Sequence, residues 1–248
     1  MIDMTRWEGS VAFVTGASAG IGAACVRRLH AAGMKVAFCA RRMDRLEALA
    51  AELGDRALPL AVDLRDEAAI LEAFARIRAR WGGVDVLVNN AGLGSDQPLS
   101  TGSTAAWREM LEVNVLALCI CTREALTDMK RRGVGQVVHV SSMASHRVPP
   151  GSGLYSATKY AVRSLTEGLR AELRAEGSAI RVAALSPGYV QTEFAERWHR
   201  SADKASATYS QYPCLQPDDV AEALLYLLGQ PPHVQVHDIL MRPTQQPL

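Results

Sequence analysis

Short runs of apolar residues alternate along the whole chain with longer segments of helical periodicity. The runs lie at 11–14, 35–38, 58–62, 85–88, 136–140, 180–184 and 235–240. Most of them are continuously apolar rather than alternating, which is typical of parallel strands covered on both faces. Segments such as 68–79 and 216–228 have the helical period, and the second opens with Pro217, a residue favoured at helix starts. The pattern therefore predicts a doubly wound α/β fold with a seven-stranded parallel sheet.

The composition excludes several classes of partner. The 248 residues contain 27 Lys and Arg against 26 Asp and Glu, and this balance favours neither nucleic acid nor an anionic membrane surface. No apolar run approaches the roughly 18 residues of a membrane span, and no export signal is visible at the N-terminus. We found no repeat or linker, so we expect a single domain over residues 1–248, located in the cytoplasm.

The cysteines and histidines do not suggest a metal site. The five cysteines form no C-x-x-C pair, and their apolar surroundings favour buried, reduced thiols. His139 lies within the apolar run 136–140, where a hydrogen-bonded core histidine is more common than a metal ligand.

A glycine-rich loop follows the first predicted strand and precedes an Ala-rich helix. Its glycines, Gly16, Gly20 and Gly22, have the spacing G-x-x-x-G-x-G. Glycines at such a place let the backbone approach a pyrophosphate at the positive end of a helix. A flexible connection without a ligand is the simpler alternative. The position of the glycine loop, between the first strand and the helix of the predicted fold, favours a Rossmann-like dinucleotide site.

The end of the second predicted strand indicates which dinucleotide is bound. An acidic residue at this place often binds the adenosine ribose of NAD, but here the chain has Arg41 and Arg42. A guanidinium can donate two parallel hydrogen bonds to a 2′-phosphate, so we predict NADP(H). Ser18 is a second candidate for that phosphate. The alternative is that both arginines end the strand in solvent.

Tyr155 and Lys159 are the strongest candidates for acid-base chemistry. Four residues apart on a helix, they lie on one face. A phenol with an ordinary pKa of about 10 needs a nearby cation to ionise at neutral pH. Most such pairs in helices are solvated surface residues, so the pair is informative only together with other motifs.

Six motifs in order give the chain a family resemblance. They are the glycine loop, Asn-Asn-Ala-Gly at 89–92, Asn114, Ser142 thirteen residues before Tyr155, the Tyr155–Lys159 pair, and Pro187-Gly188. The chain resembles the short-chain dehydrogenases/reductases over essentially its whole length. A narrower likeness, to a branch that includes NADPH-preferring animal ketosteroid reductases and insect farnesol dehydrogenases, rests on residues 3–7, 114–118, 121–125, 146–148, 165–170 and 241–244.

The resemblance implies a role for each of four catalytic residues. Tyr155 would donate a proton to the substrate oxygen during reduction or accept one during oxidation. Lys159 would lower the pKa of Tyr155 and hold the nicotinamide ribose. Ser142 would hydrogen-bond the substrate oxygen, and Asn114 would position a water in a proton relay.

The glycine loop, the arginines and the resemblance together define a set of cofactor-binding candidates. These are Gly16, Ser18, Ala19, Gly20, Ile21, Gly22, Arg41, Arg42, Glu47, Asp63, Leu64, Asn90, Ala91, Gly92, Tyr155, Lys159, Pro187, Gly188, Val190 and Thr192.

Residues 189–213, here called the lid segment, are predicted to cover the substrate. Tyr189, Phe194 and Trp198 interrupt an otherwise polar stretch, as an apolar ligand would require, although local packing explains them equally well. With Ser142 and Tyr155 they form the candidate substrate-binding set. The loop 147–154 is expected to border the entrance.

These features predict an NADPH-dependent carbonyl reductase, reversible as an alcohol dehydrogenase, acting on a hydrophobic ketone or aldehyde. An NADP-dependent 3-hydroxy acid dehydrogenase is the alternative, for which Arg147 and Arg197 are the candidate cations. A catalytically silent NADPH-binding sensor is the alternative from a different class. The apolar circumference of segment 105–129 predicts a homodimer or homotetramer.

Overall fold

A computed structural model, which describes residues 2–247, contains one sheet of seven parallel strands in the order β3-β2-β1-β4-β5-β6-β7. The doubly wound α/β fold is therefore confirmed. The strands are β1 Val11–Thr15, β2 Lys35–Ala40, β3 Ala57–Ala61, β4 Val86–Asn89, β5 Gln136–Val140, β6 Arg181–Pro187 and β7 Asp238–Met241. Each predicted run contains or overlaps one of them, and the largest differences, three residues at one end, are in β6 and β7.

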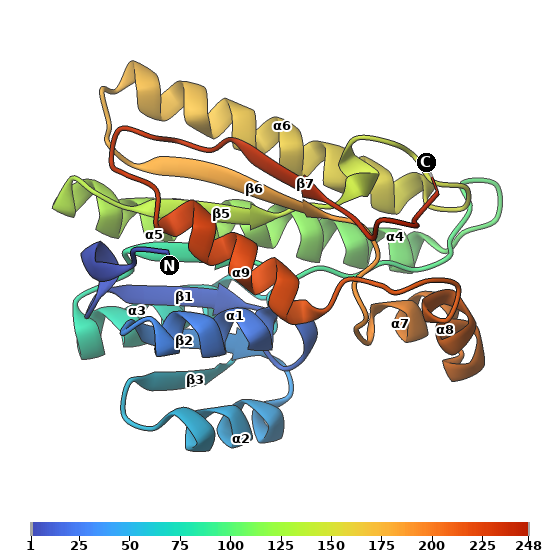
Figure 1. Cartoon of the computed structure of the whole chain (residues 1–248), viewed down its shortest axis with the longest axis horizontal. Coiled ribbons are helices and arrows are strands. Elements are labelled where there is room, and N and C mark those ends of the chain that lie inside the picture. The colour runs from blue at the N-terminus through green and yellow to red at the C-terminus, as the bar shows by residue number, and fades with distance from the viewer. Residues whose placement is uncertain (1, 248) are drawn as a thin grey trace.

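Helices cover both faces of the sheet (Figure 1). The α-helices within the described part of the chain are α1 Gly20–Ala31, α2 Met43–Leu53, α3 Glu67–Trp81, α4 Thr104–Leu111, α5 Ala117–Arg132, α6 Gly153–Ala175, α7 Phe194–His199, α8 Ala202–Tyr209 and α9 Pro217–Leu228. Buried residues of α1, α2 and α9 pack on one face, and those of α3, α5 and α6 pack on the other. None of these helices is both long and apolar enough to cross a membrane.

Helix ends follow the local chemistry of the sequence. The Asp66 side chain accepts a hydrogen bond from the Ala68 N–H at 2.9 Å and so caps α3, which ends at Gly82 in the left-handed conformation. At the start of α9, the Asp219 carboxylate accepts the Gln216 N–H at 2.7 Å, ahead of Pro217.

The core lies on the two faces of the central strands. Every residue of β1, β4 and β5 is buried. On the α3 side, Phe13 meets Phe74 edge to face with ring centroids 5.1 Å apart. His139 is a hydrogen-bonded core residue, as predicted, with Nδ1 2.9 Å from Thr166 Oγ1 and Nε2 3.3 Å from Thr122 Oγ1. Burial lowers the pKa of His139 to about 3, so this imidazole is neutral.

The apolar segment 105–129 is not one regular helix. A π-helical turn, η2 Glu112–Leu116, separates α4 from α5. A π turn accommodates one extra residue and re-aims side chains, and such turns are frequent at functional sites. Here it contains Asn114, which is buried, whereas Leu111 and Leu116 are 48% and 55% exposed.

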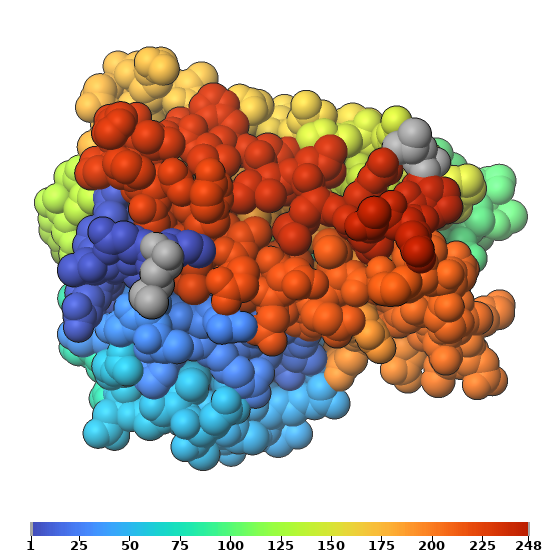
Figure 2. All heavy atoms as spheres, in the orientation of Figure 1, coloured from blue at the N-terminus to red at the C-terminus, as the bar shows by residue number. Residues whose placement is uncertain are grey.

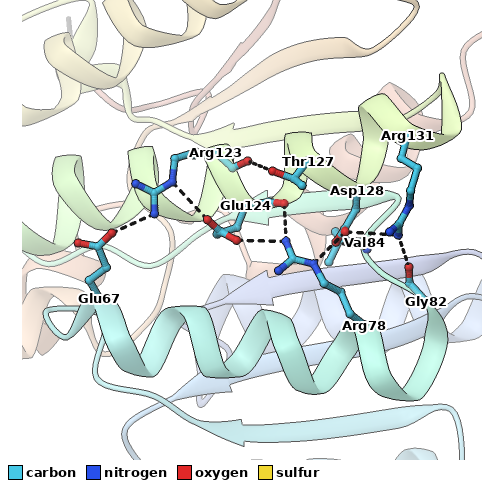
Figure 3. Close-up of polar contacts among 9 residues, drawn as sticks. All are labelled: Glu67, Arg78, Gly82, Val84, Arg123, Glu124, Thr127, Asp128 and Arg131. Carbon is cyan, nitrogen blue, oxygen red and sulfur yellow. Dashed lines mark hydrogen bonds and ion pairs between the residues drawn. The ribbon is translucent and has the colours of Figure 1, made fainter.

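An ionic network joins α3 to α5 (Figure 3). Arg78 Nε of α3 donates to Asp128 Oδ1 at 2.9 Å, and its Nη2 contacts a Glu124 carboxylate oxygen at 3.1 Å. Asp128 Oδ2 also accepts the Val84 N–H at 3.1 Å, just before β4. The Asp128 side chain is 1% exposed, so these partners, together with Arg131 Nη2 at 3.6 Å, replace the water that its carboxylate has lost.

Substituting Asp128→Ala is expected to lower the free energy of unfolding by about 3 kcal/mol, because it leaves the Arg78 Nε–H and the buried Val84 N–H without their acceptor. Urea denaturation measures this. The matched control is Glu67→Ala, which removes a 53% exposed carboxylate bonded to Arg123 in the same network and should cost less than about 1 kcal/mol. Equal losses for the two variants would contradict a special role for Asp128.

Candidate active site

A cavity of about 810 Å³ opens at the carboxyl edge of the sheet, the edge at which ligands bind in doubly wound folds. It is bounded by the loops after β1 to β6 and by residues of α6, α7 and α8. Figure 2 shows this region at the right, where the dark red C-terminal segment lies next to the orange segment that contains α8.

The glycine loop forms one wall of the cavity where the chain passes closest to the loop after β4. Gly16 has φ +70°, and a Cβ at this position would lie 2.7 Å from the Ala91 Cα. Only glycine satisfies both conditions. Asn90 links the two loops by hydrogen bonds, because its Nδ2 donates to Thr15 O at 2.9 Å and to Gly16 O at 3.1 Å.

Ser18 and Arg42 lie together, as expected for two groups that share a phosphate. Arg42 Nη2 donates to Ser18 Oγ at 2.8 Å. The same guanidinium nitrogen lies 2.9 Å from Glu193 Oε2, and Glu193 also pairs with Arg45. Glu193 precedes α7, so these ion pairs tie the lid segment to the start of α2.

Arg41 and Asp63 lie farther along the same cavity. Arg41 Nη1 is 3.8 Å from Glu109 Oε1, and its side chain is 53% exposed. Arg65 Nε donates a hydrogen bond to Asp63 Oδ1 at 3.0 Å. The hydrogen bonds from the Arg65 side chain lower the pKa of Asp63 to about 2. Asp63 therefore stays ionised at neutral pH.

Most of the predicted cofactor-binding residues line this one cavity, but Gly22 and Glu47 do not. Gly22 packs behind the loop, against Asn90 and the Gly16 carbonyl. Glu47 lies on the exposed side of α2, while Leu46 and Leu49 occupy the buried side, so its cofactor role stays a prediction.

Tyr155 and Lys159 both face the cavity from the first turns of α6. The expected lowering of the Tyr155 pKa by Lys159 is wrong for the protein's own groups. Burial raises the pKa of the Tyr155 hydroxyl to about 12, and hydrogen bonding by the Ser142 side chain acts in the opposite direction. Lys159 Nζ donates instead to Val140 O at 2.8 Å and lies 5.9 Å from the Tyr155 ring centroid.

Asn114 lies behind the cavity wall and is 1% exposed. Its Oδ1 accepts the Leu93 N–H at 2.9 Å, and its Nδ2 donates to Leu93 O at 2.8 Å and to Thr158 Oγ1 at 3.0 Å. Both amide hydrogens therefore have protein partners. This links the loop after β4 to the helix that contains Tyr155 and Lys159.

Ser142 lies at the end of β5 and caps the short helix η3 Met143–Ser145. Its Oγ accepts the Ala144 N–H at 3.0 Å, an arrangement that holds the hydroxyl in place. The hydroxyl lines the cavity next to Tyr155.

The predicted substrate residues Phe194 and Trp198 cover Tyr155. Their ring centroids lie 5.3 Å and 5.6 Å from that of Tyr155. Tyr189 lies at the root of the lid segment, 43% exposed, with its ring 6.4 Å from that of Tyr212. The lid aromatics thus pack on the candidate acid-base residue and give this end of the cavity an apolar wall.

Sequence reasoning missed several residues of the cavity, among them Leu93, Met143, Glu193 and Gln246. Leu93 and Met143 directly follow recognised motifs, so their positions could have indicated them. Gln246 lies near the C-terminus, 58 residues after Gly188 of the last recognised motif, and only the fold brings the two together. No local pattern distinguishes it from its neighbour Gln245.

The cavity fits a nicotinamide dinucleotide. The glycine loop would hold the pyrophosphate, Ser18 and Arg42 the 2′-phosphate, and Lys159 a ribose, while the residues from Pro187 to Thr192 would enclose the nicotinamide. Such a cofactor supplies the hydride for carbonyl reduction. The protein supplies a phenol that is protonated at neutral pH and a hydroxyl, Ser142, beside it.

The pKa values of this pair predict a pH profile. Tyr155 stays protonated below pH 12, but burial lowers the pKa of Lys159 to about 8, so the ammonium loses its proton as pH rises through that value. We expect kcat/KM for ketone reduction to be level from about pH 6 to pH 8 and to fall above it, because an uncharged amine is a weaker hydrogen-bond donor to the cofactor ribose than an ammonium. Initial rates in buffers of constant ionic strength measure this. A profile that keeps rising to about pH 10 would contradict the role of the ammonium.

Three comparisons place this geometry among known proteins. A family model described as short chain dehydrogenase matches residues 10–203. The chain is 51% identical over 253 residues to dehydrogenase/reductase SDR family member 11 of Bos taurus, covering 98% of this chain and 99% of that protein. It is 43% identical to a farnesol dehydrogenase of Aedes aegypti, covering 97% and 98%. The closed form of a serine dehydrogenase complexed with NADP+ superposes with a TM-score of 0.92 at 37% identity, covering 96% of both chains.

Proposed function

This chain belongs to the short-chain dehydrogenase family, and we propose that within it the protein is an NADPH-dependent carbonyl reductase for hydrophobic ketones or aldehydes. Family membership makes it an oxidoreductase of CH–OH and C=O groups with a nicotinamide cofactor. The direction, the phosphate on the cofactor and the class of substrate are the parts we propose.

The proposal depends mainly on one observation, which is that aromatic side chains cover the protonated hydroxyl-bearing ring of Tyr155. Phe194 and Trp198 pack against Tyr155, whose high pKa keeps it a proton donor throughout the neutral range. Leu93, Val148 and Pro149 line the same cavity. An apolar carbonyl compound of steroid-like or terpenoid-like shape suits these walls.

The choice of NADP(H) rests on the groups after β2. Arg42 and Ser18 are in contact at the place where a 2′-phosphate would be held, and an exposed Arg41 lies beside them. The NADP+ complex of the serine dehydrogenase, 37% identical, supports the same choice.

A 3-hydroxy acid dehydrogenase is the second candidate. Serine is itself a 3-hydroxy acid, and the serine dehydrogenase covers almost the whole chain. Arg147 and Arg197 both line the cavity and could receive a carboxylate. Arg197 Nη2 lies 3.5 Å from Glu193 Oε2 and so already has an anionic partner. Arg147 is therefore the better candidate for that role.

An NADPH-consumption screen over steroid ketones, terpenoid aldehydes, aryl ketones and β-keto acids tests the proposal, with Tyr155→Phe as the blank. We expect kcat/KM for the best apolar carbonyl compound to exceed that for the best keto acid by at least about tenfold. A preference for keto acids would establish the second candidate instead. Absence of turnover with every class would favour the catalytically silent sensor.

We also propose that two or four copies associate through α4, η2 and α6. Leu111 and Leu116 are about half exposed on a single chain, and Tyr160 and Leu165 of the adjacent α6 are 40% and 36% exposed. An apolar face of this kind on adjacent helices suits a second copy. Light scattering is expected to give a multiple of the 26.8 kDa chain mass, and Leu116→Asp should shift it toward one chain. A monomer before substitution would contradict this.

A further inference from the structure

The C-terminal segment after β7 returns to the cavity and places one buried amide there. Gly188 N–H donates to Met241 O at 2.7 Å, which fixes the segment beside the root of the lid segment. Gln246 follows a turn in which its own N–H donates to Pro243 O at 3.1 Å. Its side chain lines the cavity although the residue is only 7% exposed.

The contacts of Gln246 determine which end of its amide faces the cavity. The Tyr189 N–H, which can only donate, lies 3.1 Å from Oε1. Oε1 also lies where a side chain on residue 188 would start, since a Cβ there would be 2.2 Å away. The carbonyl end is therefore held against Gly188 and Tyr189, and the NH2 group points the other way.

The NH2 group of Gln246 has only a weak partner in the protein. Its Nε2 lies 3.6 Å from Met143 Sδ, and a thioether sulfur is a weak acceptor. A buried amide nitrogen with two hydrogens to donate normally has an oxygen partner. Ser142, Met143 and Gln246 line the same cavity. This weakly bonded donor therefore shares the cavity with Ser142, the group expected to hold the carbonyl that is reduced.

We propose that Gln246 determines specificity by donating a hydrogen bond from Nε2 to a second oxygen acceptor on the substrate, separate from the carbonyl that is reduced. The inference rests on the proposed function, because it concerns the substrate of that reaction. The ligand class is a ketone with a further carbonyl, hydroxyl or ester oxygen. A neutral donor requires no charge on the substrate, which matches the apolar walls of the cavity.

Gln246→Glu isolates this role. It keeps an oxygen for the Tyr189 N–H and replaces the NH2 group with an oxygen that cannot donate when ionised. The test compares ethyl acetoacetate with 2-heptanone, which has the same chain length and lacks the second carbonyl. The matched control is Gln245→Glu, one position earlier on the exposed side of the segment.

We expect Gln246→Glu to lower kcat/KM for ethyl acetoacetate by about tenfold or more and to change that for 2-heptanone by less than about threefold. Gln245→Glu should leave both values unchanged, and NADPH affinity should be the same for all three proteins. Equal losses on both ketones, or no loss on either, would overturn the proposal while leaving the reductase function intact. If the unsubstituted enzyme reduces neither these ketones nor any compound of the wider panel, the reductase function fails and this inference with it.

Discussion

Substitution Tyr155→Phe is expected to lower kcat for ketone reduction by about 10²- to 10⁴-fold, because it removes the proton donor while keeping the ring that packs on Phe194 and Trp198. NADPH affinity and the melting temperature should stay unchanged. Steady-state NADPH consumption and fluorescence titration of NADPH measure the two effects separately.

Tyr160→Phe is the matched control for this substitution. Tyr160 lies on the same helix, α6, but it is 40% exposed and is absent from the cavity wall. Its loss of a hydroxyl should leave kcat within about twofold of the unsubstituted enzyme. Comparable turnover by the Tyr155 and Tyr160 variants would exclude Tyr155 as the acid.

The second large effect is expected at Arg42. Arg42→Ala should raise the Kd for NADPH by about 10- to 100-fold, because hydrogen bonds between ionised groups contribute about 1.5–3 kcal/mol. The Kd for NADH should change by less than about threefold, since NADH has no 2′-phosphate. Arg41→Ala should have a smaller effect, because Arg41 is 53% exposed and contacts Glu109 rather than Ser18.

Arg45→Ala controls for the ion pairs around Glu193. Arg45 pairs with Glu193, as Arg42 does, but it does not line the cavity. Its substitution should leave the ratio of NADPH to NADH affinity unchanged. If Arg45→Ala shifts that ratio as much as Arg42→Ala does, the effect comes from the freed Glu193 carboxylate rather than from a phosphate contact.

The cavity also shows how partners distant in sequence control a local motif. The helix α6 places Lys159 one turn after Tyr155 on the same face, as the four-residue spacing predicts. The direction of its ammonium, however, depends on Val140 O at the end of β5, which accepts from it at 2.8 Å. The pKa of Tyr155 is likewise set by enclosure under α7, which the sequence around Tyr155 does not encode.

The family resemblance implied Ser142. The sequence by itself determined the strands, several of the helices, the glycine loop and the candidates Tyr155, Lys159 and Arg42. These features depend on local periodicity and on spacings of a few residues, where backbone geometry alone decides which side chains share a face. Only the tertiary structure decided that Glu193 meets Arg42, that Asn114 lies in a π turn bonded to Leu93, and that Gln246 faces the cavity. Such contacts join residues from 21 to more than 100 positions apart, and they exist only because strand order and helix packing bring those residues together.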